Sequence, residues 1–187
     1  MTHILKYCNK LSELSVESTD EILKDLKTIN FQKGDYLLKE GQICKHLFFV
    51  EKGLVKIYFV KEDKEFIMRF IEEGKMFSVF ESFLTQIPSN YSVVALEQTT
   101  VSLINYNQME VLCEKHHCVE TFYRKLISLA TINMTRRISE ILEKDLPRSY
   151  NHFLIENKQI IQRISLGDMA KYLGITQQSL SRIRKQK

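Results

Sequence analysis

The sequence lacks the features that secreted, membrane-spanning or disulfide-bonded proteins require. No apolar run in its 187 residues approaches the length of a membrane span, and the first residues lack the apolar core of a signal peptide. Its four cysteines, at positions 8, 44, 113 and 118, form no CxxC pair, which favours free thiols. Because the chain lacks a membrane span and a signal peptide, we expect a cytoplasmic protein. Since 44% of the residues are hydrophobic, we also expect a packed apolar core.

Charge is distributed unevenly along the chain. Residues 119–187 contain 13 Lys and Arg against 6 Asp and Glu, a net charge of +7, whereas residues 1–118 contain 14 against 17, a net charge of −3. Such asymmetry indicates two domains with different partners. A positive C-terminal domain suits contacts with the phosphates of DNA.

The apolar periodicity changes twice along the chain, which predicts a mixed α+β fold. Residues 11–30 are predicted to form a helix. Short β-rich runs separated by turn signals follow at 36–39, 47–50, 54–60, 65–71, 76–80, 91–96 and 100–105. Regular strands of this kind are typical of an antiparallel jelly roll or barrel. Helical spacing returns at 108–114, over a long segment at 119–144 and at 149–156.

The long helical segment carries two neighbouring stripes. One stripe would pack on the barrel and the other on a second subunit, unless the helix is buried on all sides within one chain. The sequence Asp145-Leu146-Pro147 ends this helix and marks a hinge. The first stripe comprises Val119, Phe122, Leu126, Leu129 and Asn133, and the second Tyr123, Ile127, Ala130, Met134 and Ile141.

Residues 164–187 are spaced as two short helices folded across a tight turn. Ser165 can cap the first helix, and Asp168 favours its N-terminal end. Ala170 is small where the helices cross, Gly174 allows the left-handed backbone that ends the first helix, and Thr176 caps the second. The spacing predicts a helix-turn-helix.

The second of these helices has an apolar face and a polar face. Leu180 and Ile183 point inwards, and the outward positions are Gln177, Gln178, Ser181, Arg182 and Lys185. Gln and Arg can make paired hydrogen bonds to adenine and guanine edges in the major groove, so this face suits a recognition helix. The alternative is an amphipathic helical hairpin with a solvated polar face.

Four segments in this order, residues 31–41, 47–57, 95–101 and 164–187, resemble the cyclic-AMP receptor protein and fumarate-nitrate reductase regulator (Crp/Fnr) family. The resemblance covers nearly the whole chain. It implies a cyclic-nucleotide-binding-type β-roll at 1–118, a dimerisation helix at 119–144 and a winged-helix-like DNA-binding domain at 145–187. It further implies a homodimer, a palindromic operator in double-stranded DNA read by two recognition helices roughly 34 Å apart, RNA polymerase as a partner and a small effector.

The resemblance also assigns roles within the DNA-binding domain. The family's base-contacting positions correspond to Gln177, Gln178 and Arg182. Members with Arg-Glu at the first two positions read a G·C-containing half-site, so two glutamines shift the expected preference towards adenine. The sequence ends where the family continues into a β-hairpin wing, so either the protein lacks the wing or the sequence is truncated. Phosphate or capping contacts are expected from Thr176, Ser179, Ser181, Arg184, Lys185 and Lys187.

Residues 74–95 match the family's effector cassette, the segment that holds the ligand's phosphate, but depart from its pattern. Cyclic-nucleotide binders hold the phosphate with an arginine, but no arginine lies between Arg69 and Arg124. We therefore expect an effector other than cyclic AMP, or none. Glu81 is the candidate for the ribose-binding carboxylate, and the alternative is that this segment is a polar surface loop. The candidate effector residues are Gly74, Phe77, Glu81, Ser82 and Ser92.

Other chemistries find little support in the sequence. Iron-sulfur sensors of the family carry an N-terminal cysteine cluster, which Cys8 alone does not supply. The segment 113–118 holds two thiols and two imidazoles without the spacing of a zinc module, and we interpret it as the turn into the long helix. We expect no cofactor, metal or catalytic residue. The alternatives are a cupin-like metal-dependent enzyme, although His46 stands alone among the strands, and an interaction module that has lost DNA binding.

Overall fold

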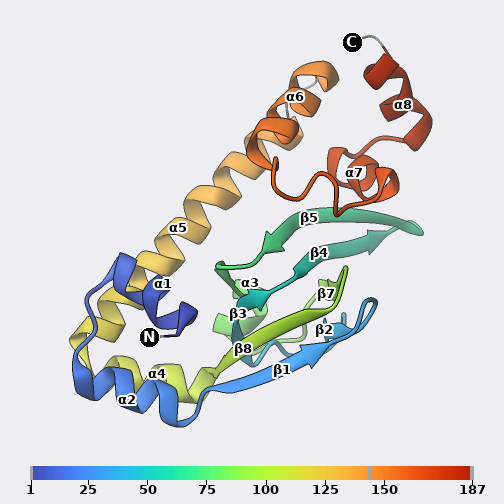
Figure 1. Cartoon of the computed structure of the whole chain (residues 1–187). Helices are drawn as coiled ribbons and strands as arrows, with labels where there is room; N and C mark the ends of the chain where they lie inside the picture. Colours follow the sequence, from blue (N-terminus) through green and yellow to red (C-terminus); the bar gives the residue numbers. More distant parts are fainter. Residues whose placement is uncertain (1, 143–144, 186–187) are drawn as a thin grey trace.

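The computed structural model describes residues 2–142 and 145–185, which form an antiparallel β-roll, a long helix beside it and a group of short C-terminal helices (Figure 1). The helices are α1 His3–Leu11, α2 Val16–Lys24, α3 Phe80–Thr85, α4 Tyr106–Lys115, α5 His117–Leu142, α6 Leu146–Glu156, α7 Leu166–Leu173 and α8 Gln177–Lys185. The strands are β1 Lys27–Phe31, β2 Tyr36–Leu38, β3 His46–Lys52, β4 Leu54–Lys61, β5 Lys64–Glu72, β6 Met76–Phe77, β7 Ser92–Ala95 and β8 Thr99–Asn105.

Two four-stranded antiparallel sheets make up the roll, in the orders β1-β8-β3-β6 and β2-β7-β4-β5. Successive residues of a strand point to opposite faces, so the alternating apolar residues of both sheets meet between them. The β4–β5 hairpin turns at Glu62 and Asp63, both of which adopt positive φ. Two successive left-handed residues give the tight turn that matches the twist of paired strands.

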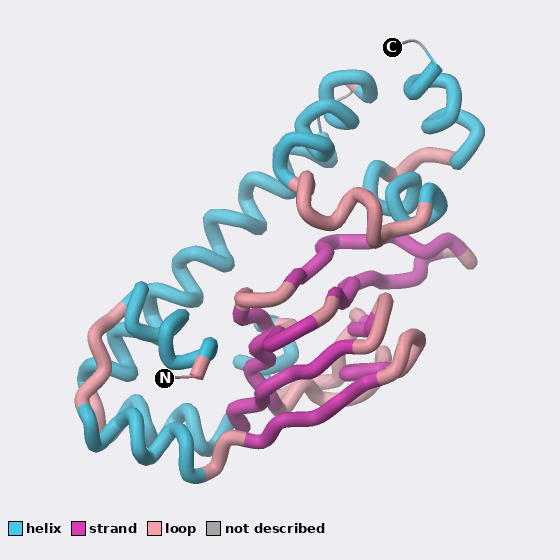
Figure 2. Tube along the Cα trace, viewed as in Figure 1, coloured by secondary structure: helices cyan, strands magenta, loops and turns pink. Residues whose placement is uncertain are grey.

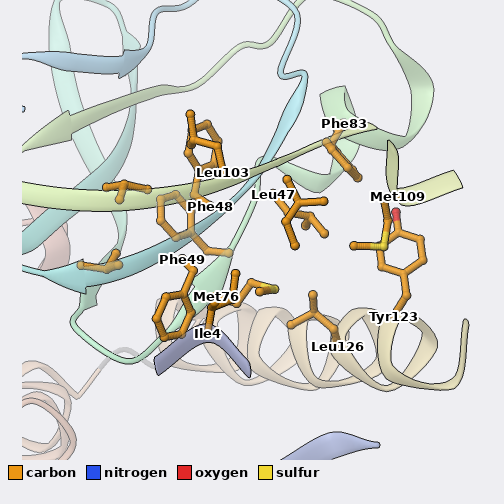
Figure 3. Close-up of a cluster of buried hydrophobic side chains, with 14 of the residues drawn as sticks. Ile4, Leu47, Phe48, Phe49, Met76, Phe83, Leu103, Met109, Tyr123 and Leu126 are labelled. Carbon is orange, nitrogen blue, oxygen red and sulfur yellow. The ribbon is translucent and has the colours of Figure 1, made fainter. Parts of the chain in front are cut away.

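The roll and the beginning of α5 share one apolar core. Figure 3 shows Tyr123 and Leu126 of α5 pointing from the helix into this cluster, with Tyr123 beside Met109. Val119, Phe122 and Leu126, from the first predicted stripe, are buried in this core. Further along α5 the helix leaves the roll, and Leu129 is 40% exposed. The first stripe is therefore buried only over its first half.

The predicted strands and late helices are confirmed, but two predictions are wrong. Residues 11–30 are not one helix, because α2 ends at Lys24 and the chain then forms β1. Strand β1 extends the sheet by pairing with β8, where the hydroxyls of Thr28 and Ser102 lie 3.2 Å apart. Residues 76–80 are not one strand either, since Phe80 begins α3. Of the predicted helix 119–144, residues 143 and 144 lie outside the described residues.

A second, smaller core lies among the C-terminal helices. Phe153 of α6, Met169 and Ala170 of α7 and Leu180 of α8 are buried together. Phe70, on the outer face of β5, packs against this cluster. In Figure 2 the helices that follow α5 lie over the outer strand of the roll. The roll therefore serves as the base on which α7 rests.

No helix among the described residues combines the length and apolarity needed to span a membrane.

The tight approach of Gly53 to β8 predicts a stability difference between two glycine substitutions. Gly53 and Gly41 both have positive φ, but a Cβ on Gly53 would lie 2.7 Å from the Cα of Thr99, whereas nothing lies within 4 Å of a Cβ on Gly41. Both alanine variants lose about 1–2 kcal/mol because the left-handed backbone is strained. We expect Gly53→Ala to lose a further ~1–3 kcal/mol from overpacking.

Urea denaturation measures this difference, with Gly41→Ala as the matched control. Equal losses in the two variants would contradict the steric argument.

Candidate nucleic-acid interface and effector cleft

Helix α7 begins and ends as its sequence predicts. The hydroxyl of Ser165 accepts a hydrogen bond from the backbone N–H of Asp168 at 2.9 Å. Gly174 ends the helix in the left-handed conformation, with φ 69° and ψ 27°. Ala170 is buried against α8. These local signals set the turn between the helices, because each satisfies a geometry that few other residues allow.

Helix α8 presents a polar face to solvent and buries the opposite one. Thr176 caps it by accepting from the N–H of Ser179 at 3.2 Å, and Leu180 is fully buried. Gln178, Arg182 and Lys185 are exposed and fall at positions i, i+4 and i+7, which share one side of a helix. Of the other candidate DNA contacts, Thr176, Gln177 and Arg184 are exposed, and Ser179 and Ser181 are half-buried.

Gln177 differs from its neighbours because its side chain turns back towards α7. A Cβ built on Gly167 would lie only 2.6 Å from Nε2 of Gln177. The missing side chain at Gly167 therefore leaves room for the amide of Gln177 beside the first turn of α7. Sequence reasoning missed this role of Gly167, because the two residues lie in different helices.

Lysines and carboxylates join α7 to the roll. Lys56 of β4 lies 3.0 Å from Asp168 and 2.6 Å from Glu65, and Lys171 lies 3.0 Å from Glu65. Burial acts to raise the pKa of Asp168, but hydrogen bonds from Ser165 and Lys56 outweigh it and lower that pKa. For Lys56, burial acts to lower the pKa, and bonds to both carboxylates outweigh it. The charged form of each residue is therefore favoured.

Arg163 forms a second connection between the C-terminal segment and the roll. Its guanidinium lies 2.7 Å from Glu97 and 2.9 Å from Glu73. Hydrogen bonds that Arg163 donates to Glu97, and then to Glu73, raise its pKa against the opposing effect of burial. A planar guanidinium between two carboxylates fixes orientation as well as distance. The segment before α7 is thereby held at the edge of the roll.

Arg137 of α5 is the buried cation of this region. Its Nη2 donates hydrogen bonds to the backbone carbonyls of Tyr172 in α7 and Ile67 in β5, and Nη1 lies 3.3 Å from Glu140. The guanidinium also stacks 3.7 Å above the ring centre of Tyr172. One side chain thus contacts the long helix, the roll and α7. The sequence signal for this buried role was the position of Arg137 between Met134 and Ile141 of the apolar stripe.

The structure places the five candidate effector residues in different surroundings. Gly74 lies in the exposed turn between β5 and β6, Phe77 packs in the core, and Glu81 is exposed at the start of α3. The hydroxyl of Ser82 accepts from Cys44 N–H and donates to Ile87 C=O. The hydroxyl of Ser92 accepts from Glu40 N–H at 3.0 Å. Both buried hydroxyls are thus engaged by the protein backbone.

A cleft of about 1800 Å³ lies between the roll and α5, bounded by α1 on one side and by α6 and Tyr172 on the other. We refer to it as the α5 cleft. Phe77 and Glu81 line it, and so does Arg69 of β5. Burial lowers the pKa of Arg69. The cleft is large enough for a small molecule, and both apolar and charged side chains line it.

No group of three His, Cys, Asp or Glu side chains capable of holding a metal ion occurs in residues 2–142 and 145–185. The segment 113–118 spans the junction of α4 and α5, and His116 is its one residue outside both helices. Within this segment, Cys118 contacts α2, and its Sγ lies 3.5 Å from the hydroxyl oxygen of Ser18.

Comparison with known proteins agrees with this fold. Residues 28–116 match the cyclic nucleotide-binding domain. The chain is 24% identical over 186 residues to electron transport regulator A of Shewanella oneidensis, which covers 92% of this chain and 72% of that protein. These findings confirm the resemblance to the Crp/Fnr family.

Two solved structures share the fold. A protein from Eubacterium rectale assigned to the Crp/Fnr family of transcriptional regulators superposes with a TM-score of 0.75 at 18% identity, covering 92% of this chain and 83% of that chain. FixK2 from Bradyrhizobium japonicum gives a TM-score of 0.74 at 19% identity, covering 86% of this chain and 83% of that chain. The similar proteins are regulatory proteins, which makes an enzyme a poor description of this chain.

The ion pair between Lys56 and Asp168 predicts a pH-dependent contribution to stability. A lowered pKa for Asp168 means that its stabilising effect is complete above the ordinary Asp pKa of about 3.9 and is lost as the pH falls through the folded-state value. We expect Asp168→Asn to lower the free energy of unfolding by about 1 kcal/mol at pH 7, since the pair is partly solvated. The difference from the parent protein should disappear under acid conditions.

Thermal unfolding between neutral and acid pH measures this effect. Asp20→Asn is the control, because Asp20 is an exposed carboxylate in α2. A difference between parent and Asp168→Asn that is independent of pH would contradict the electrostatic explanation.

Proposed function

Because the chain carries a cyclic nucleotide-binding domain and resembles the Crp/Fnr regulators along its length, we propose that it is a homodimeric, sequence-specific DNA-binding regulator of transcription. The observation that carries the proposal is the exposed face of α8, where Gln178, Arg182 and Lys185 lie on one side of a helix held by its buried Leu180. Amide and guanidinium groups at this spacing suit the major groove.

The side chains of α8 divide by their expected contacts with DNA. Gln178 and Arg182 are exposed and are assigned to base edges, with adenine and guanine as their expected targets. Gln177 reaches a base only after its side chain leaves Gly167. The remaining polar residues are assigned to phosphates: Thr176, Ser179, Ser181, Arg184 and Lys185.

Reading a palindrome requires a second copy, and α5 offers the surface for it. Met134, Ile138 and Ile141 fall at positions i, i+4 and i+7 and are 46%, 51% and 54% exposed. An apolar stripe of this length on a long helix suits pairing with the same stripe of a partner. In this arrangement residues 1–118 are the sensor, 119–144 the dimerisation helix and 145–187 the DNA-binding domain. The last two residues of that domain lie outside the described part of the chain.

Regulation requires that a ligand favour one position of the DNA-binding domain. We assign the effector site to the α5 cleft, because it touches the roll, α5 and Tyr172 of α7 together. The effector is a small molecule other than cyclic AMP, since the cassette has no arginine for a cyclic phosphate. RNA polymerase is the expected partner on DNA.

Selection of duplexes from a random DNA library at moderate salt tests DNA reading. We expect an enriched palindrome, and we expect Arg182→Ala to bind it about 10–100-fold more weakly with relaxed preference at one guanine, as for loss of a bidentate base contact. Arg124→Ala is the matched control, because Arg124 is an exposed arginine of α5 outside the cleft.

The selection is repeated with a small-molecule extract of cells, so that a required effector is supplied. No enrichment under either condition would overturn the proposal.

Sedimentation equilibrium tests the dimer. We expect Ile138→Glu to raise the dimer dissociation constant at least about tenfold, since each dimer would bury two unpaired carboxylates. Val16→Glu is the control, because Val16 is an equally apolar and more exposed residue of α2. A monomeric parent protein, or equal dissociation constants for both variants, would contradict pairing through α5.

A further inference from the structure

Arg69 lines the α5 cleft from β5 and has no direct ion-pair partner within the described residues. It is half-buried, yet within residues 2–142 and 145–185 it donates no hydrogen bond and forms no ion pair. Withdrawing a guanidinium from water without a partner is costly, and its lowered pKa has burial as its main cause. An unpaired arginine at the wall of a cleft is an electrostatic site that an anion would complete.

The charged groups near Arg69 are already engaged with one another. Glu140 is the nearby carboxylate, but its Oε2 accepts from Arg137 at 3.3 Å and from the Tyr172 hydroxyl at 3.2 Å. Its Oε1 lies 3.5 Å from His152. Arg137 adds positive charge beside Arg69. Glu140 therefore acts on Arg69 only as a longer-range attraction, which Arg137 opposes, and forms no direct ion pair with it.

The composition of the cleft points in the same direction. Seven Lys and Arg side chains line it against four Glu. Its walls also carry aromatic side chains, among them Tyr7 and Tyr91. A site with a cationic anchor and aromatic walls suits a small organic molecule with one acidic group.

We propose that the α5 cleft binds a small organic anion, a carboxylate or a phosphate ester, whose charged group pairs with Arg69 of β5. This proposal deepens the proposed function by naming the chemical class of the effector. It replaces the cassette anchor expected from the sequence with one contributed by a neighbouring strand. The guanidinium can bind either anion in a bidentate manner.

Such a ligand has a direct route to the DNA-binding helices. Arg137 holds the Tyr172 carbonyl and stacks on the Tyr172 ring, and Arg69 lies in the electrostatic field of both residues. An anion beside Arg69 also attracts Arg137, so it changes the balance of the contacts that hold α7 on the roll. The ligand therefore favours one position of α7 and α8 over another.

Isothermal titration calorimetry on the full chain at constant ionic strength tests the site. The probes are phenyl phosphate and benzoate, with benzyl alcohol as the neutral counterpart. We expect at least one of the two anions to bind with a dissociation constant below about 10 mM and benzyl alcohol to bind at least about tenfold more weakly. Arg69→Gln should lose at least about tenfold in affinity for the anion, and Arg69→Lys should retain part of it.

Arg124→Gln is the matched control, because it removes the same charge from an exposed site of α5. Unchanged thermal unfolding of Arg69→Lys separates loss of the site from loss of the fold. Equal anion affinity in the parent and Arg69→Gln, or no binding of either anion, would overturn the proposal. Since these titrations contain no DNA, their result is independent of whether the chain reads an operator.

Discussion

The buried guanidinium of Arg137 is the interaction on which the arrangement of this protein depends. Its hydrogen bonds to Ile67 and Tyr172 and its ion pair with Glu140 bring the roll, α7 and α5 to one point. A buried charge is stable only where its partners are fixed, so it restricts how these elements can sit. Its Nε is buried without a hydrogen-bond partner among the described residues.

Those other contacts form a layer of charge between the roll and the C-terminal helices. The pairs of Lys56 with Asp168 and of Arg163 with Glu73 and Glu97 lie around the small apolar contact of Phe70. Partly solvated ion pairs contribute little net stability and depend on geometry. Charge pairs therefore join apolar packing in holding α7 against the roll.

Much of the fold was predictable because its signals are local. The cap at Ser165, the left-handed Gly174 and the buried Leu180 fix helices α7 and α8 within about twenty residues of sequence. The strands of the roll were also predictable from alternation and turns. Strand β1 was not, because its residues carry a helical spacing and only pairing with β8 makes them a strand. The hydrogen bonds of Ser82 and Ser92 were not predictable for a similar reason, since their partners are backbone groups that no periodicity reveals.

The sequence by itself determined the order of the elements, the two-domain charge asymmetry and the polar face of α8, because these follow from spacing and composition. Only the tertiary structure decided where charges meet. Arg69 lies before the cassette in sequence, but β5 carries it into the cleft beside α5. Arg137 and Tyr172 are 35 residues apart and are joined by the packing of α7 on the roll. Contacts between distant segments depend on the shape of the whole core, which local sequence patterns do not encode.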